Sequence, residues 1–418
     1  MERTVGRLRL LAQGLLPSAS PTGGAPACVE DVVRRLGMVQ AQDLRQAFWA
    51  VGVRLPGSSE ADLRAAFDAG RIVRTWGARG TLMLLAPERV RPLLSLTAPR
   101  MMAQMASRRR ELGIDDGVVA TAVQVARPLC AVPPEARPPE ARSQEARQLA
   151  SGPTPAVPGH RAPDRTGPRA ARPGATRAEL LAAFEEAGLR TDGQRGIHTL
   201  MAVCLAGHLV QGPMADDGRT AGQRFVLAEH WLPAGDLAGP GDPAGPRVLD
   251  RIAVDYFRGH GPATERDLAW WLGLPLTPVR AAVERLTQPA PGEPGLVGRE
   301  RAGSEERYWM AAETAERWDD PPGARSVLAL PGFDEFLLGY ADRSAVLDPA
   351  HAQRVVPGSN GVFRRTLVVG GSVAGCWEPP ARGGRDEPRA EHFEPPPGPR
   401  TRAGWAARMR EYQRFVGR

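Results

Sequence analysis

Two glutamines separated by one residue, Gln40 and Gln42, are the side chains of this sequence best placed to do chemistry. They project to the same side if the chain is extended here, but not if it is helical. Two amides on one side offer paired donors and acceptors that can hold a water molecule against a sugar carbon. Because an amide takes up no proton near neutral pH, such a pair suits a leaving group that departs readily, such as a cationic N-alkylated purine. The same spacing also fits glutamines that cap a helix or bind backbone groups.

A short turn between two apolar segments predicts a hairpin at residues 75–81, with the sequence Thr-Trp-Gly-Ala-Arg-Gly-Thr and Arg79 at its tip. Arg79 can clamp a phosphate or enter a groove of DNA. Trp76 can stack on a base, although packing in the core is the simpler role for a tryptophan. The residues that we expect to contact DNA are Arg45, Arg74, Thr75, Arg79, Thr81, Arg266 and Arg280.

Carboxylates next to aromatic residues form a further candidate site, with Asp334 and Glu335 inside the segment 333–336 and Asp342 and Arg343 shortly after it. Paired acids can catalyse glycosidic hydrolysis, but an ion pair between Asp342 and Arg343 that holds a turn is the simpler expectation. The seven histidines show no metal-ligand spacing, and we expect core or surface roles for those on the helix predicted near residue 200, His198 and His208.

Composition excludes one kind of chemistry, the catalysis that needs a lysine side chain. The 418 residues carry a formal charge of +7, and all 54 basic residues are arginines because the sequence contains no lysine. Arginine suits phosphate and guanine, although a GC-rich genome is the simpler explanation for the missing lysines. Schiff-base catalysis by a lysine side chain is therefore excluded.

The cysteines and the hydropathy pattern add further expectations. Cys28, Cys130, Cys204 and Cys376 are scattered, without a CxxC pair, and indicate neither zinc nor a disulfide framework. We therefore expect no metal, no cofactor and a reducing cytoplasm. No apolar stretch approaches the roughly 20 residues that span a bilayer, so we expect no membrane partner.

Residues 248–310 predict three helices followed by a hairpin. Apolar spacing indicates a helix over 248–257, Thr264 caps a second helix that runs to Leu272, and Thr277-Pro278 begins a third. Two strand-like pieces, 295–298 and 307–310, are joined by a charged turn. Helices followed by such a hairpin are typical of a winged helix-turn-helix module.

Two earlier segments repeat this pattern. In one, helices over 176–188 and 194–207 precede strands at 209–210 and 225–227. In the other, helices near 6–15 and 29–38 and a helix capped by Ser59 and Asp62 precede a hairpin formed by 71–75 and 81–85. Three such modules in one arginine-rich chain favour binding to nucleic acid over packing or protein contacts alone.

Two tracts interrupt this organisation. Residues 131–175 are rich in proline, alanine and arginine, with pentads at 133–137, 138–142 and 143–147, and we expect a disordered linker there. Residues 379–402 are expected to form a long low-complexity loop.

The fold prediction is α+β, with winged-helix modules at 1–130, 176–232 and 245–315 and a β-rich C-terminal domain at 322–418.

Three stretches resemble a known family, the AlkZ-like DNA glycosylases. They are Leu36–Gln42, Arg74–Trp76 followed by Arg79–Leu82, and the run Pro331–Tyr340, which continues through Asp342-Arg343-Ser344 and Val355–Gly358. The C-terminal run is the most specific to the family, and the resemblance covers nearly the whole chain apart from the two tracts. It implies a C-shaped protein of three winged helices and a β-rich C-terminal domain that removes N-alkylated purines or interstrand crosslinks without conventional base flipping.

The resemblance also implies roles for individual residues. Gln40 and Gln42 match the family's catalytic pair, which positions the attacking water. A related branch that acts on a broader set of crosslinks has aspartate as the second residue, so Gln42 indicates the narrower branch. Many relatives have a histidine where this chain has Met83, so a DNA contact or water-positioning role of that side chain is lost here.

The sequence therefore predicts a monofunctional DNA glycosylase that acts as a monomer on double-stranded DNA. We expect its role to be DNA repair, which could include resistance to DNA-alkylating agents. The alternative is a non-catalytic winged-helix DNA-binding protein, such as a regulator or a damage sensor.

Overall fold

The computed structural model describes residues 2–16, 26–141, 172–215, 222–234, 245–289, 291–301, 306–359, 361–380, 388–394 and 398–417. Helices and strands are mixed along these ranges, so the fold belongs to the expected α+β class. Within the same ranges, no helix combines the length and the apolarity needed to cross a membrane.

The N-terminal segment, residues 1–130, contains the predicted capped helix and the predicted hairpin. Ser59 and Asp62 form a reciprocal capping box at the start of the helix, which satisfies its first free N–H groups. The elements of this segment are α1 (Glu2–Ala12), α2 (Val29–Leu36), β1 (Val39–Gln40), α3 (Leu44–Gly52), α4 (Glu60–Asp68), β2 (Val73–Trp76), β3 (Leu82–Leu85), α5 (Pro87–Gln104), α6 (Ala106–Glu111) and α7 (Asp116–Cys130).

The next two segments also follow their capping signals. Thr176 and Thr264 each cap a helix, and a carboxylate three residues later completes each capping box. The second segment, residues 176–232 with the preceding β4 (Ala175–Thr176), contains α9 (Arg177–Glu186), α10 (Arg195–Leu205), β5 (Leu209–Met214), β6 (Gln223–Leu227) and α11 (Ala228–Trp231). The third segment, residues 245–315, contains α12 (Gly245–His260), α13 (Glu265–Leu272), α14 (Leu276–Leu286), β7 (Val297–Glu300), β8 (Arg307–Met310) and α15 (Ala312–Ala315).

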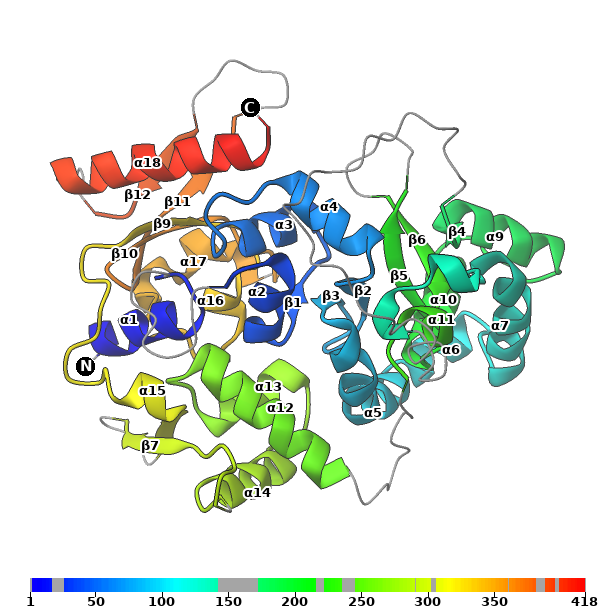
Figure 1. The fold of residues 1–418 in the computed structure, drawn as a ribbon, viewed down its shortest axis with the longest axis horizontal. Helices are drawn as coiled ribbons and strands as arrows, with labels where there is room; N and C mark the ends of the chain where they lie inside the picture. Colours follow the sequence, from blue (N-terminus) through cyan, green and yellow to red (C-terminus); the bar gives the residue numbers. More distant parts are fainter. Residues whose placement is uncertain are drawn as a thin grey trace, which may run out of the picture.

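The first two segments share one sheet. Its strand order is β1-β3-β2-β5-β6-β4, so the hairpin of the N-terminal segment pairs with the hairpin of the second segment. The pairing is made at one position, where Arg74 of β2 faces Gln211 of β5. Figure 1 shows the two hairpins side by side in the body of the molecule. No sequence pattern indicated this pairing, since backbone groups make it.

The C-terminal segment, residues 322–418, combines a four-stranded antiparallel sheet with a long helix that lies on its outer side (Figure 1). The expected loop at 379–402 is wrong in part, because strand β12 and the start of helix α18 fall within it. Backbone pairing with β11 orders the strand, and Met409 and Phe415 bury the inner face of the helix. The elements are β9 (Val327–Leu330), α16 (Glu335–Leu338), η4 (Pro349–His351), α17 (Ala352–Val355), η5 (Pro357–Ser359), β10 (Thr366–Val369), β11 (Ser372–Glu378), β12 (Arg389–His392) and α18 (Pro399–Phe415).

The beginning of the expected disordered linker is also structured. Residues 134–136 and 139–141 form short 3-10 turns, η2 (Pro134–Ala136) and η3 (Pro139–Ala141). Val132 is buried, and its N–H donates to Nδ1 of His230 at 3.1 Å. Proline restricts the unfolded chain, so ordering these turns loses little entropy. The third pentad, 143–147, lies outside the described residues.

Candidate active site

Strand β1 places the two glutamines on one side of the chain. Gln40 faces Met83 across the pair of strands, and the N–H of Ala41 donates to the carbonyl of Leu82 at 2.8 Å, so the extended conformation continues past Gln40. Val39 and Ala41 are fully buried, whereas Gln40 is half-buried and Gln42 is exposed. Because side chains alternate along a strand, both amides project away from the core that holds Val39 and Ala41.

Asp43, rather than either glutamine, caps the next helix. Its Oδ1 accepts hydrogen bonds from the N–H groups of Arg45 and Gln46 at 3.0 and 3.3 Å, and its Oδ2 accepts one from Nε2 of Gln46 at 3.1 Å. The capping role that the sequence left open for the glutamines is therefore filled by their neighbour. Both oxygens of this carboxylate therefore accept hydrogen bonds from helix α3.

The two amides keep free hydrogen-bonding groups. Oε1 of Gln42 accepts from the N–H of Leu82 at 3.4 Å, and its NH2 group has no partner among the described residues. Within the same ranges, the amide of Gln40 makes no hydrogen bond. One exposed NH2 donor and one unused amide can together orient a water molecule.

Arg74 lies behind this motif. Its Nη2 donates to the backbone carbonyl of Gln42 at 3.3 Å, and its Nη1 donates to Oε1 of Gln211 and of Gln223 at 3.0 and 3.2 Å. Burial lowers the pKa of Arg74 to about 10, against a smaller opposing effect of Asp43, so the guanidinium stays charged at neutral pH.

Arg74 and Thr75 were predicted to contact DNA, but the structure gives them little or no surface. Arg74 is 8% exposed and Thr75 is 0% exposed. Trp76 is also buried, so the core role expected for it is confirmed. The side chains of β2 are therefore buried in the protein and not exposed at its surface.

The hairpin tip docks onto two other parts of the chain. Arg79 has a positive φ of 56°, and its guanidinium lies 4.3 Å from the ring centre of Trp270 in α13. Its Nη1 donates to the carbonyl of Leu338 at 3.4 Å, and burial lowers its pKa. Arg343 lies over the same tryptophan at 5.1 Å. The guanidinium expected to clamp a phosphate is thus engaged with the third and C-terminal segments.

The other predicted DNA contacts retain exposed surface. Arg45 and Thr81 are half-buried close to the motif. Arg266 of α13 and Arg280 of α14 are exposed, and each approaches a carboxylate, Glu306 at 2.6 Å and Glu265 at 3.4 Å. Ion pairs this exposed are weak and exchange readily with a phosphate.

The first of the candidate carboxylates, Asp334, belongs to a buried ion pair. Its two oxygens accept hydrogen bonds from Nη1 and Nη2 of Arg54, both at 2.8 Å, and both side chains are excluded from solvent. Arg54 also donates to Oε1 of Gln13 at 2.7 Å. Through Arg54, Asp334 therefore joins the C-terminal segment to the residues just after helices α1 and α3.

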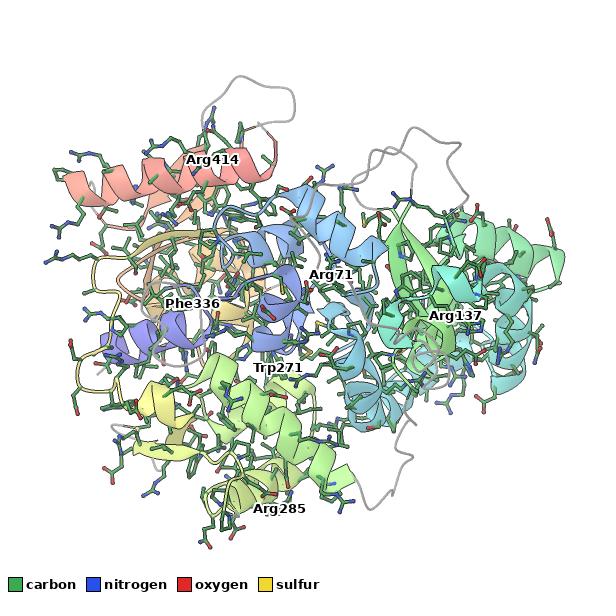
Figure 2. The ribbon with its side chains drawn as sticks, in the orientation of Figure 1. Arg71, Arg137, Trp271, Arg285, Phe336 and Arg414 are labelled. Carbon is green, nitrogen blue, oxygen red and sulfur yellow. The ribbon has the colours of Figure 1, made fainter. Side chains whose placement is uncertain are left out.

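Glu335 is buried and makes its contacts through Oε2, whereas Asp342 is half-buried and belongs to an ion pair. Oε2 of Glu335 accepts from Nε1 of Trp271 at 2.9 Å and lies 3.3 Å from Nε2 of His260. Figure 2 places Trp271 in the middle of the molecule. Asp342 pairs with Arg301 of the third segment, so the expected pair with Arg343 is wrong. Tertiary packing places Arg301, which is 41 residues away in the chain, next to Asp342. Arg343 instead donates from Nε to the carbonyl of Leu337.

No group of three or more potential metal ligands occurs in the described part of the chain. A cavity of about 20 Å³ lies beside Gly37 and Met38, which precede the motif in the chain. That volume holds a water molecule but no nucleobase. The candidate site lies outside this cavity, on the exposed side of β1 and of the residues that follow it.

Before any comparison, the described structure is that of an α+β, arginine-rich protein with a partly exposed pair of amides next to a carboxylate, Asp43, that caps a helix. The sequence model described as DNA glycosylase AlkZ-like matches residues 33–415. The chain therefore belongs to the AlkZ-like DNA glycosylase family. It is a DNA-binding hydrolase of DNA repair, and the non-catalytic alternative is not supported.

A solved structure agrees with this assignment. Streptomyces sahachiroi DNA glycosylase AlkZ resembles the chain with a TM-score of 0.72 and 22% identity, covering 99% of this chain and 96% of that one. At this identity, the likeness shows a shared fold. A search of curated proteins found no match.

Proposed function

We propose that this chain is a monofunctional glycosylase that hydrolyses the N-glycosidic bond of N-alkylated purines, alone or within interstrand crosslinks, with Gln40 and Gln42 as its catalytic pair. The observation that carries the proposal is the division of roles along the motif. Strand β1 directs both amides outward, and Asp43 takes the helix cap. Beyond the hydrogen bond from the N–H of Leu82 to Oε1 of Gln42, the two amides are left without a structural task that would explain them.

The free groups of the pair suit the orientation of one water molecule. The NH2 group of Gln42 donates a hydrogen bond to the water oxygen, and Oε1 of Gln40 accepts a hydrogen bond from one O–H group of the water. The water oxygen then bonds to C1′ of the deoxyribose while the C1′–N bond breaks, and its electron pair leaves with the purine. Because alkylation has made that purine cationic, it departs as a neutral base, and the proton of the attacking water goes to solvent.

The two amides of the motif are too weak to act as a general base, and this restricts the enzyme to substrates with a labile glycosidic bond. A neutral amide stabilises a water by hydrogen bonds but removes no proton, so the enzyme depends on the lability of the glycosidic bond. A purine that is neutral before departure is a far poorer leaving group. With no lysine in the sequence, the chain also has no side-chain amine for Schiff-base cleavage of the abasic product.

The three helix-and-hairpin segments serve as winged-helix modules in this proposal, and the protein acts on duplex DNA as a monomer. Each has helices followed by a two-stranded hairpin, the order found in such modules. Arg266 and Arg280 contact DNA phosphates from the third module, and Arg45 and Thr81 contact DNA beside the motif. Their exposure supports these contacts, whereas Arg74 and Thr75 are proposed to act from the interior.

The test is excision from duplex DNA methylated at N7 of guanine. We expect the native protein to release 7-methylguanine and to leave alkali-sensitive sites under single-turnover conditions. The double variant Gln40→Ala/Gln42→Ala should lose at least about 100-fold in rate, the scale typical of losing a hydrogen-bonding group that acts on the transition state. Its affinity for the same duplex should stay within about threefold, since exposed phosphate contacts supply most of the binding.

Asp43→Ser is the matched control, because serine also caps a helix. We expect its excision rate to remain within about threefold of the native rate, in keeping with a role as a cap. A native rate in the double glutamine variant would refute the catalytic pair. A large loss in Asp43→Ser alone would move the chemistry to that carboxylate.

A further inference from the structure

Arg74 connects the catalytic motif to the second segment. It is the residue of β2 that pairs with β5, and its guanidinium bonds to groups on both sides of that junction. On one side is the backbone carbonyl of Gln42. On the other side are the side-chain oxygens of Gln211 and Gln223, both from strands of the second segment and both buried.

We propose that Arg74 is a positioning residue for Gln42, through which Gln211 and Gln223 of the second segment hold the catalytic motif in its active orientation. This inference rests on the proposed role of Gln42. The second segment then contributes to the chemical step as well as to the fold.

The geometry explains why an arginine is needed. Its planar fork reaches acceptors in two directions at once, at distances of 3.0 to 3.3 Å, which a single ammonium group does less well. The amide of Gln223 is itself oriented, because its Nε2 donates to the carbonyl of Gly212 at 3.3 Å. A chain of oriented groups thus runs from β5 and β6 to the motif.

The position of this contact lets Arg74 control the direction of the Gln42 side chain. Arg74 holds the peptide unit that follows Gln42, between the end of strand β1 at Gln40 and the cap of helix α3 at Asp43. Rotation of that peptide would turn the Gln42 side chain away from Gln40. The NH2 group of Gln42 would then point elsewhere, while the DNA-contacting arginines on α13 and α14 would be undisturbed.

The structural alternative is that Arg74 only ties two segments together. Arg172 provides a matched control for that role, because its Nη1 joins the same two segments through Asp68 of α4 and the carbonyl of Met214 in β5, both at 2.7 Å. Those bonds lie away from the carbonyl of Gln42. Losing Arg172 should therefore weaken the junction without turning the motif.

The experiment measures single-turnover excision of 7-methylguanine and the affinity for the same duplex in full-length variants. We expect Arg74→Met and Gln223→Leu to lower the rate at saturating enzyme by about 10- to 100-fold, the range for a misplaced catalytic group, with affinity within about threefold. Arg74→Lys should fall between native and Arg74→Met. Arg172→Met should lower the melting temperature but keep the native rate in the folded protein.

Chemical rescue separates positioning from folding. In Arg74→Ala, millimolar methylguanidinium should raise the excision rate at least threefold above the same concentration of sodium chloride, because it refills the guanidinium site. It should leave Arg172→Ala unaffected. If Arg74→Met does not fold, the excision rates of Arg74→Lys and Gln223→Leu are compared with that of Arg172→Met instead.

Three results would overturn the inference: native rates in all folded variants at Arg74 and Gln223, a loss confined to DNA affinity, or an equal rate loss in Arg172→Met. These are distinct from a failure of the proposed function. A native protein inactive on alkylated duplex would refute that function and this inference together, whereas an active native protein with unaffected Arg74 variants refutes the inference alone.

Discussion

The amides on and just after β1 and the carboxylates around α16 are two regions with side chains able to act in hydrolysis, and they differ in how those side chains are used. Asp334 and Glu335 are buried and bonded to Arg54, Trp271 and His260. Gln40 and Gln42 face outward with unused hydrogen-bonding groups. The stronger acid–base groups therefore hold the fold together, and the weaker ones lie where a substrate can reach them.

The difference follows from the cost of burying charge. A carboxylate removed from water is tolerated when a cation and hydrogen-bond donors surround it, and it is then unavailable to a substrate. A neutral amide loses far less on partial burial and can stay unpaired at a surface. An exposed pair of amides is consequently a better indication of a site in this molecule than a buried pair of acids.

The largest expected effect concerns the buried region. Arg54→Met leaves the carboxylate of Asp334 without its partner in the interior, and we expect a loss of about 3–5 kcal/mol in the free energy of unfolding. Chemical denaturation of the native and variant proteins measures this loss. The double variant Arg54→Met/Asp334→Leu should recover most of it, because no unpaired charge remains. If the single variant loses less than about 1 kcal/mol in the free energy of unfolding, the ion pair between Arg54 and Asp334 contributes little to stability.

A change at the exposed region should alter how excision depends on pH. Native excision should be flat from pH 5 to 8, since neither glutamine titrates. In Gln42→Asp, the carboxylate accepts a proton from water only when ionised, so the rate should fall about tenfold per pH unit below a pKa near 4. Rates from pH 3.5 to 8, corrected for spontaneous depurination, test this. Identical profiles would indicate that residue 42 does not contact the water.

The smallest effect should come from the exposed arginines of the third segment. Arg266→Gln and Arg280→Gln together should reduce the slope of log affinity against log salt by about 2, one for each phosphate that is no longer neutralised. Excision at saturating enzyme should keep its native rate, since neither side chain belongs to the motif. An unchanged slope would place the DNA away from α13 and α14.

Local signals in the sequence predicted much of the fold. The capping boxes at Ser59, Thr176 and Thr264 begin helices as expected, because a cap depends on residues within one turn. The hairpins at 73–85 and 209–227 also follow their apolar pattern. The spacing of Gln40 and Gln42 identified the candidate site but left its conformation open, since a strand and a cap were both compatible with it.

Long-range contacts were not predictable in this way. No pattern showed that Arg74 would meet Gln211, that Asp342 would pair with Arg301, or that residues 389–392 would join a sheet. Each depends on a partner far away in the chain. Such a partner is specified by the packing of whole elements, and no residue pattern near the contact indicates it.

The sequence alone determined the residue types of the candidate site and the chemistry they permit, because an amide cannot become a base and a chain without lysine cannot form a lysine Schiff base. Tertiary structure alone decided which of these groups are free. Pairing with β3 extends the motif, the cap of α3 occupies Asp43, and packing around Arg54 and His260 encloses the carboxylates. Availability to a substrate depends on neighbours in space, and those neighbours come from every segment of the chain.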